Sequence, residues 1–236
     1  MPQIFKPPVQ PKGRISSGVT AVNELCVFTD FDGTITEPDT IDLLGKLFDR
    51  PSERAIMKEK LITGLIRPKE WLNWEIGLVN APLDEVLEML RKRVVIDPAF
   101  PPFAKWCQSQ NIPLTILSNG LEEIIHSLLG QYNMDSVRIE ANRLRVGCVP
   151  WKVVFRDDSA WGHDKSAYLK ESIRNGYAPV FAGDGVSDRD AADCAEVVFA
   201  KKQLAEYCKS MDLSYHHFSS FEDIQSVLDR LLREGK

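Results

Sequence analysis

Residues 25–34, with the sequence LCVFTDFDGT, constrain the fold most, because an apolar run ends there in two aspartates. A run of this kind predicts a buried strand whose carboxyl end carries acidic side chains into a loop. In an α/β sheet, ligands bind at this edge. Asp30 can offer a carboxylate oxygen, and Asp32 its backbone carbonyl, to a hard cation such as Mg²⁺. Gly33 permits a sharp exit from the strand, and the groups around Thr34 can donate to an anion.

The segment that follows is helical in pattern. Between residues 40 and 93 several amphipathic stretches succeed one another, and no strand pattern of quality interrupts them. Pro51, Pro68 and Pro82 stand at the starts of three stretches, where the first helical turn tolerates proline. We therefore expect a small all-helical unit, residues 37–96, inserted between the first strand and the rest of the sheet.

Two tryptophans of this unit, Trp71 and Trp74, lie three residues apart and share one helix face. Two interpretations stay open. Both indoles form the core of the helical unit, or one of them faces a substrate.

A second strand pattern, residues 112–117, ends in Ser118, Asn119 and Gly120 and is followed by a helical pattern. A hydroxyl, a side-chain amide and free N–H groups at a helix start make an anion site. An ordinary capped turn between a strand and a helix is the alternative interpretation of these three residues.

A third strand pattern, residues 179–182, ends in the sequence GDGVSD, in which Asp184 and Asp188 stand four residues apart. Asp188 is also placed where an acidic residue stabilises a helix start. Further strand and helix patterns continue to residue 232. We therefore expect residues 23–36 and 97–236 to form one doubly wound α/β core with a mostly parallel sheet.

Lys165 is the candidate basic residue. Asp164 can cap a helix, which places Lys165 in the first turn, where a cation is unfavourable against the helix dipole. A lysine there suggests a nearby negative charge, although a solvated lysine is the alternative. Lys152 and Lys170 are the competing candidates, and their positions favour them less.

In this order the segments resemble the four motifs of the haloacid dehalogenase (HAD) superfamily of phosphohydrolases. The motifs are D-x-D-G-T at residues 30–34, Ser118, Lys165 and G-D-G-x-x-D at residues 183–188. The resemblance covers roughly residues 24–200. It implies a HAD-like (Rossmann-like) sheet with a small helical cap, and a Mg²⁺-dependent phosphomonoester hydrolase acting on a small phosphorylated metabolite.

The resemblance also implies roles for the acidic residues. Asp30 would attack phosphorus to give an aspartyl phosphate, and Asp32 would act as general acid and base. Asp30, Asp32 and Asp184 would hold Mg²⁺, which removes the repulsion between a carboxylate and a phosphate dianion. Asp188 would support the site by ligating the metal through water or by fixing Lys165.

For the substrate, the resemblance implies that Ser118, Asn119 and Lys165 hold the phosphate group. Asp39 and Trp74 are the candidates for contact with the rest of the substrate. The branch resembled includes phosphoserine phosphatases and 2-hydroxy-3-keto-5-methylthiopentenyl-1-phosphate phosphatases of methionine salvage, which gives two substrate expectations. A phosphomutase or phosphotransferase, and a catalytically retired binding protein, stay open as alternatives.

Composition limits the expected binding partners and the expected cellular compartment. A net charge of -5 and a pI near 5.5 argue against nucleic acid, and no apolar stretch predicts a membrane span. Five cysteines without a C-x-x-C pair favour a reducing cytoplasm. Residues 1–22 lack the apolar core of a signal peptide, so we expect a flexible lead-in. No feature specifies an oligomeric state.

Overall fold

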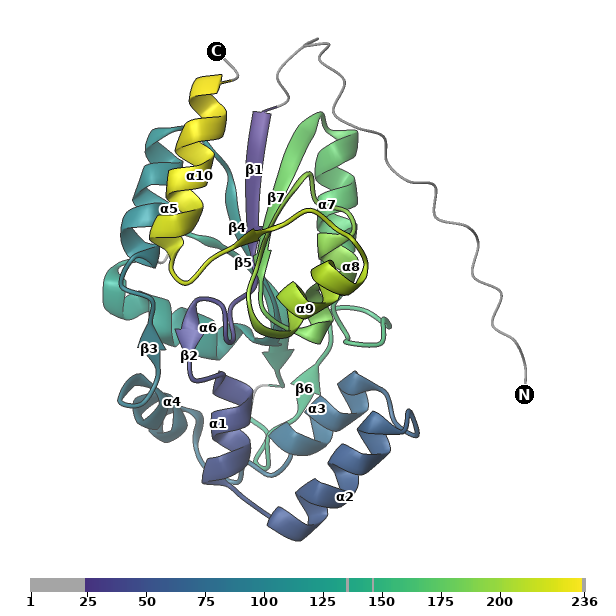
Figure 1. The fold of residues 1–236 in the computed structure, drawn as a ribbon. Coiled ribbons are helices and arrows are strands. Elements are labelled where there is room, and N and C mark those ends of the chain that lie inside the picture. The colour runs from purple at the N-terminus through teal and green to yellow at the C-terminus, as the bar shows by residue number, and fades with distance from the viewer. Residues whose placement is uncertain (1–23, 135, 146, 235–236) are drawn as a thin grey trace, which may run out of the picture.

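The computed structural model describes residues 24–134, 136–145 and 147–234, so the lead-in predicted for residues 1–22 lies outside the described residues. A seven-stranded sheet in the order β6-β5-β4-β1-β7-β8-β9 forms the centre of the molecule (Figure 1). Its strands are β1 (Glu24–Thr29), β4 (Leu114–Leu121), β5 (Arg138–Leu144), β6 (Val153–Val154), β7 (Tyr177–Gly183), β8 (Val197–Ala200) and β9 (His216–His217). Among these pairings only β5–β6 is antiparallel. The predicted doubly wound, mostly parallel α/β fold is confirmed.

The central strand β1 shows why helices cover both faces of the sheet. Val27 packs into one buried cluster, while its neighbours Cys26 and Phe28 pack into a second cluster. Successive side chains of a strand point to opposite faces, so an uninterrupted apolar run needs a partner layer on each side.

Six helices provide these two layers (Figure 1). On one face lie α5 (Phe100–Ser109), α6 (Glu122–Leu129) and α10 (Phe221–Glu234). On the other face lie α7 (Lys165–Arg174), α8 (Arg189–Ala192) and α9 (Lys202–Ser210). Short 3₁₀ turns, η1 (Gly130–Tyr132) and η2 (Val186–Asp188), complete the connections.

Four helices lie beyond the carboxyl ends of the strands, at the bottom of Figure 1. They are α1 (Thr40–Leu47), α2 (Pro51–Ile62), α3 (Pro68–Ile76) and α4 (Leu83–Arg91). A two-stranded antiparallel ribbon of β2 (Thr36–Glu37) and β3 (Val95–Ile96) joins them to the sheet. The sequence does not predict this ribbon, because two-residue strands carry no readable alternation. The division of the chain at residues 37 and 96 stays a prediction.

An ion-pair network links three helices of this cap. Arg54 of α2 donates to Glu75 of α3 at 2.8 Å and to Asp42 of α1 at 2.9 Å. Glu75 is buried, and a Cβ on Gly45 would lie 1.7 Å from its Oε1 atom. Glycine at position 45 therefore leaves room for the carboxylate, and Arg54 balances its charge. This network attaches α2, a helix with no fully buried side chain of its own.

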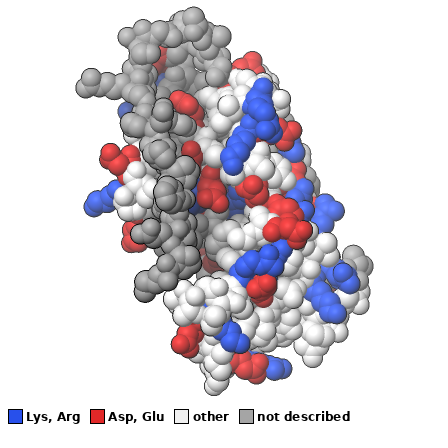
Figure 2. Space-filling model, turned by 90° about the vertical axis from the view of Figure 1, so that its right-hand side faces the viewer, with Lys and Arg blue, Asp and Glu red and all other residues white. Residues whose placement is uncertain are grey.

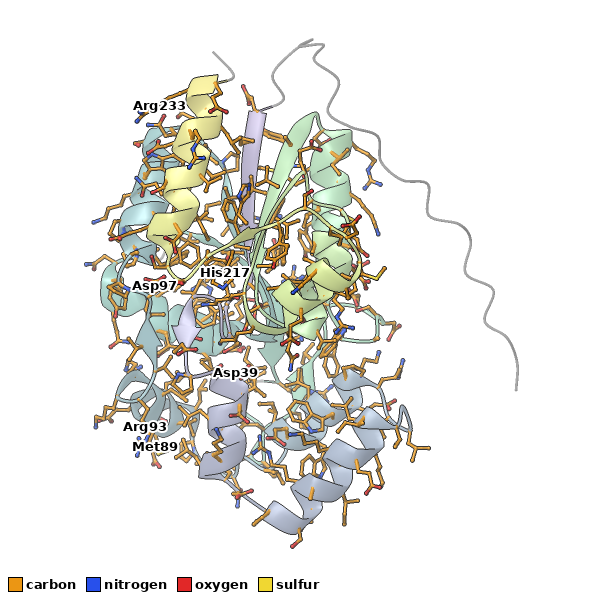
Figure 3. The ribbon with its side chains drawn as sticks, in the orientation of Figure 1. Asp39, Met89, Arg93, Asp97, His217 and Arg233 are labelled. Atoms are coloured by element: carbon orange, nitrogen blue, oxygen red, sulfur yellow. The ribbon has the colours of Figure 1, made fainter. Side chains whose placement is uncertain are left out.

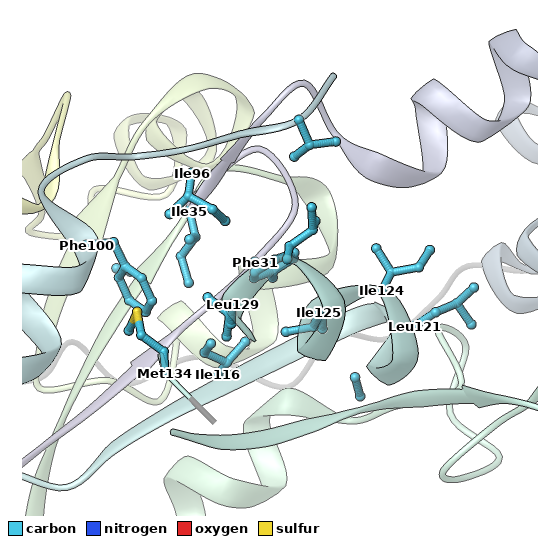
Figure 4. Close-up of a cluster of buried hydrophobic side chains, with 14 of the residues drawn as sticks. Phe31, Ile35, Ile96, Phe100, Ile116, Leu121, Ile124, Ile125, Leu129 and Met134 are labelled. Atoms are coloured by element: carbon cyan, nitrogen blue, oxygen red, sulfur yellow. The ribbon is translucent and has the colours of Figure 1, made fainter. Parts of the chain in front are cut away.

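The main core anchors the loop that follows β1. Phe31 stands between the two aspartates and is fully buried beside Ile35 and residues of α6 (Figure 4). Its carbonyl oxygen accepts the N–H of Ile35 at 2.8 Å, which closes the turn. Because Phe31 points into the core, the backbone on either side of it is held in one conformation.

On the face drawn in Figure 2, blue and red side chains of the described residues are interspersed, and neither charge forms a continuous stripe. No helix among the described residues is both long enough and apolar enough to cross a membrane.

The aromatic contacts of Phe221 at the start of α10 give a test of this packing. Its ring lies 4.8 Å from Phe100 and 5.2 Å from Phe103 between centroids, and the side chain is fully buried. We expect Phe221→Ala to lower the free energy of unfolding by about 3–5 kcal/mol in urea titrations. Leu231→Ala, on an exposed part of the same helix, is the control and should change it by less than about 0.5 kcal/mol. Equal effects of the two substitutions would contradict the packing described.

Candidate active site

Groups that are far apart in the sequence meet at the carboxyl end of the sheet. Asp30 directly follows β1, and Asp184 directly follows β7, the parallel neighbour of β1. Lys165 is the first residue of α7. Ser118 lies within β4, which continues to Leu121 where the sequence predicted a turn. The strand continues because β4 resumes its pairing with β5 after an irregularity.

Lys165 is the centre of the charged cluster. Its Nζ atom lies 2.5 Å from Asp30 Oδ1 and 2.7 Å from Asp188 Oδ1. The lysine is only 3% exposed. Burial by itself would lower the pKa of Lys165, but Asp188 and Asp30 raise it above its ordinary value. The ammonium therefore stays charged and balances two carboxylates.

Asp188 uses both of its oxygens within the protein. Oδ1 accepts from Lys165, and Oδ2 accepts the backbone N–H groups of Asp184 at 3.0 Å and Gly185 at 2.9 Å. The carboxylate is completely buried. Of the two roles expected for Asp188, the geometry favours fixing Lys165 and the loop that carries Asp184.

Asp32 points toward the cap rather than into the cluster of the other aspartates. Its Oδ1 atom accepts the N–H of Thr40, the first residue of α1, at 2.8 Å. Burial, followed by the charge of Asp39, raises the pKa of Asp32 to about 7. A carboxyl group with such a pKa can both donate and accept a proton near neutral pH. Asp39 caps α1 and lies between that helix and the sheet (Figure 3).

An oxygen-lined group of acids could hold a metal ion. One carboxylate oxygen each from Asp30, Asp184 and Asp188 can be chosen so that all three lie within 4.8 Å of one another. The three carboxylates outnumber Lys165, the ammonium that contacts two of them. Burial and neighbouring carboxylates raise the pKa of Asp30 and Asp184, so a bound cation would favour their ionised forms. Oxygen donors with excess negative charge suit a hard divalent cation such as Mg²⁺. The side chain of Asp32 lies outside this group. Asp32 could therefore bind the metal ion through its backbone carbonyl oxygen.

The two polar residues of β4 are held in different ways. The Ser118 hydroxyl oxygen accepts the N–H of Gly120 at 2.9 Å, so its own hydrogen can be donated elsewhere. The Asn119 amide donates to the carbonyl oxygen of His163 at 3.1 Å. Both residues border the same cavity as Asp30.

This cavity has a volume of about 450 Å³ and lies between the sheet and the cap. Its cap side is formed by Ile41, Pro68, Trp71 and Leu72, and Asp39 also lines it. Of the two tryptophans, Trp71 is among the residues that line the cavity and Trp74, the candidate chosen from the sequence, is not. The spacing of the two indoles places them on one helix face but does not tell which one meets the cavity.

Trp161 and Lys202 are among the lining residues that were not singled out as candidates from the sequence. Lys202 has a left-handed backbone (φ 48°), and its Nζ atom lies 3.2 Å from Asp184 Oδ2 and 3.1 Å from the carbonyl oxygen of Gly33. Its place just after β8, at the same sheet edge as Asp30 and Asp184, was a usable signal. Trp161 lies in an irregular segment and carries no such signal.

Comparisons with known proteins agree with the motifs. A family model described as haloacid dehalogenase-like hydrolase matches residues 27–193. Pdp3-interacting factor 1 of Schizosaccharomyces pombe is 40% identical, covering 88% of this chain and 96% of that protein. The polyol phosphate phosphatase of Saccharomyces cerevisiae is 31% identical, covering 89% and 95%. A 2-hydroxy-3-keto-5-methylthiopentenyl-1-phosphate phosphatase of Lysinibacillus sphaericus is 27% identical, covering 87% and 94%.

Solved structures share the fold. A substrate-bound phosphoserine phosphatase matches with a TM-score of 0.65 at 17% identity, over 88% of this chain and 99% of that one. A phosphoserine phosphatase with an analogue of the phospho-aspartyl intermediate matches with a TM-score of 0.63. The resemblance predicted from the four motifs is confirmed, and the chain belongs to the haloacid dehalogenase-like hydrolases, as one of their phosphatases.

Proposed function

We propose that this phosphatase hydrolyses small phosphomonoesters with Mg²⁺ through an aspartyl phosphate on Asp30. The observation that carries the proposal is the buried contact of Lys165 with Asp30 and Asp188. A buried ammonium beside a buried carboxylate limits the repulsion between that carboxylate and an approaching phosphate. Asp30 also borders the cavity, so a substrate can reach it.

The proposed reaction has two halves. An Asp30 oxygen bonds to phosphorus while the bond from phosphorus to the leaving oxygen breaks, and Asp32 gives its proton to that oxygen. A water molecule then attacks phosphorus, Asp32 takes the proton of that water, and the Asp30 carboxylate is released with inorganic phosphate. The pKa of about 7 suits Asp32 for both directions of transfer.

The remaining groups of the site would bind the phosphoryl group and the metal ion and orient them. The Ser118 hydroxyl and Lys165 would hold phosphoryl oxygens, with Asn119 beside them. Asp30, Asp184 and the Asp32 carbonyl would hold Mg²⁺, which supplies positive charge against the phosphoryl oxygens. Asp188 would keep Lys165 and the Asp184 loop in place.

For the rest of the substrate, we propose an uncharged leaving group. The cap contributes mainly apolar side chains to the described cavity lining, among them Trp71 and Leu72, and no lysine or arginine. A substrate carboxylate such as that of phosphoserine would lack a cationic partner on the cap side, because Lys202, a lysine of the cavity lining, belongs to the core and contacts Asp184. Polyol phosphates or 2-hydroxy-3-keto-5-methylthiopentenyl-1-phosphate fit this lining better, and two relatives carry these substrates in their names.

We also propose a cytoplasmic setting for the protein, which the buried thiols of Cys26 and Cys107 suggest.

A panel of phosphate esters tests the proposed function. With Mg²⁺, we expect release of inorganic phosphate from polyol phosphates or the methylthiopentenyl ester with kcat/KM at least about tenfold above phosphoserine. Chelation of the metal should abolish turnover. Asp30→Asn should reduce kcat by at least about 10³-fold, while Asp190→Asn, an exposed aspartate nearby, serves as the control. Transfer of phosphate to a second sugar without its release would favour a mutase, and near-normal turnover by Asp30→Asn would contradict the covalent scheme.

The raised pKa of Asp32 predicts a pH-dependent effect on stability. The folded chain binds this proton more tightly than the unfolded chain, so stability from this group is lost as pH rises through about 7. In metal-free buffer at pH 8–9, Asp32→Asn should therefore increase the free energy of unfolding by about 1–3 kcal/mol. The difference should vanish near pH 4, and urea titrations at both pH values measure it. A variant less stable than the natural chain at pH 8–9 would refute the assignment.

The two cap tryptophans provide a matched test of the cavity. Removing the Trp71 ring takes away apolar contact with the leaving group, so Trp71→Ala should raise KM about tenfold. Trp74 lies outside the cavity lining, so Trp74→Ala should keep KM within about twofold of the value of the natural enzyme. Steady-state kinetics on the best ester of the panel give both values. The opposite order of effects would show that the cavity is assigned to the wrong indole.

A further inference from the structure

The strand that carries Ser118 is irregular at the active site. Leu117 of β4 is paired with Glu140 of β5, and Leu121 is paired with Asn142. Three residues, 118–120, therefore stand opposite one residue of β5. The pairing of β4 with β1 ends earlier, at Ile116. Backbone carbonyls in such an interruption lose regular ladder partners and need others when they are buried.

Two side chains supply these partners. His163 lies with its Nδ1 atom 2.8 Å from the carbonyl oxygen of Ser118, and Asn142 donates to the carbonyl oxygen of Asn119 at 2.8 Å. In return, the Asn119 side chain donates to the carbonyl oxygen of His163 at 3.1 Å. The pair of contacts between residues 118–119 and His163 closes a ring between β4 and the segment that leads into Lys165.

The contact defines the chemical state of the imidazole. A carbonyl oxygen can only accept, so Nδ1 of His163 carries the hydrogen and Nε2 does not. His163 is 2% exposed, and burial lowers its pKa to about 4, so the ring is neutral at physiological pH. The ring of Tyr168 packs edge-on against it, with centroids 5.3 Å apart. Packing and hydrogen bonding thus hold one tautomer in one orientation.

We propose that His163 is a positioning residue that sets the Ser118 hydroxyl in register with the Lys165 ammonium. The proposal rests on the proposed function, in which both groups hold oxygens of the same phosphoryl group. His163 contacts the backbone of Ser118 and stands two residues before Lys165, so it joins the two elements directly. Loss of its N–H would leave a buried carbonyl without a donor and let the strand end shift.

Substitutions that replace one ring nitrogen at a time test this role. The amide nitrogen of asparagine reaches approximately the position of Nδ1, whereas that of glutamine reaches approximately the position of Nε2. We expect His163→Gln to raise both KM and the inhibition constant of inorganic phosphate about tenfold. His163→Asn should keep both values within about twofold of the natural enzyme. Both variants lose the packing of the ring, and His163→Gln also leaves the Ser118 carbonyl without its donor, so its melting temperature should fall further than that of His163→Asn.

Controls separate positioning from general damage. His126→Gln, on the half-exposed face of α6, should change none of these values. In ¹⁵N-labelled natural protein, the His163 resonances should show hydrogen on Nδ1 alone between pH 5.5 and 8. Equal phosphate binding by His163→Gln and His163→Asn, or hydrogen found on Nε2, would overturn the proposal. Absence of phosphate release by the natural enzyme would instead refute the proposed function.

Discussion

The burial of one ammonium group is the constraint on which the site depends. A lysine that is 3% exposed must have its charge compensated, and Lys165 obtains this from Asp30 and Asp188. Asp30 directly follows β1, Asp188 lies in the turn η2 that follows β7, and the lysine comes from the start of α7. The same contacts that place the reactive carboxylate therefore also hold three elements of the core together. Loss of either partner would leave a single carboxylate in contact with the buried ammonium.

Close packing of backbone against carboxylates completes the geometry. A Cβ on Gly33 would lie 2.3 Å from Asp184 Oδ2, and a Cβ on Gly120 would lie 2.6 Å from Asp32 Oδ2. In each case the glycine of one motif leaves space for the acid of another. Gly33 also has φ 76°, which other residues adopt at a cost. The glycines thus let the carboxyl groups of Asp184 and Asp32 lie directly against the backbone of another motif.

Much of this arrangement is predictable from the sequence because strand ends carry a local signal. An apolar run that stops at polar residues is enough to locate Asp30, Ser118 and Asp184, and parallel topology brings them to one edge. The helical segments of the cap follow from proline positions and apolar spacing. The motifs of a known family locate Lys165 more firmly than helix-dipole reasoning does, since an isolated lysine is normally solvated.

What the sequence does not predict depends on side-chain direction and long-range contact. The spacing of Trp71 and Trp74 cannot tell which indole meets the cavity, and the contact of His163 with Ser118 joins residues that no local pattern connects. A crystal structure with Mg²⁺ and fluoroberyllate, a mimic of an aspartyl phosphate, tests the central claim most directly. The account predicts fluoroberyllate on Asp30, with Lys165 and the Ser118 hydroxyl contacting its fluorines. Fluoroberyllate bound elsewhere, or Lys165 turned away into solvent, would contradict it.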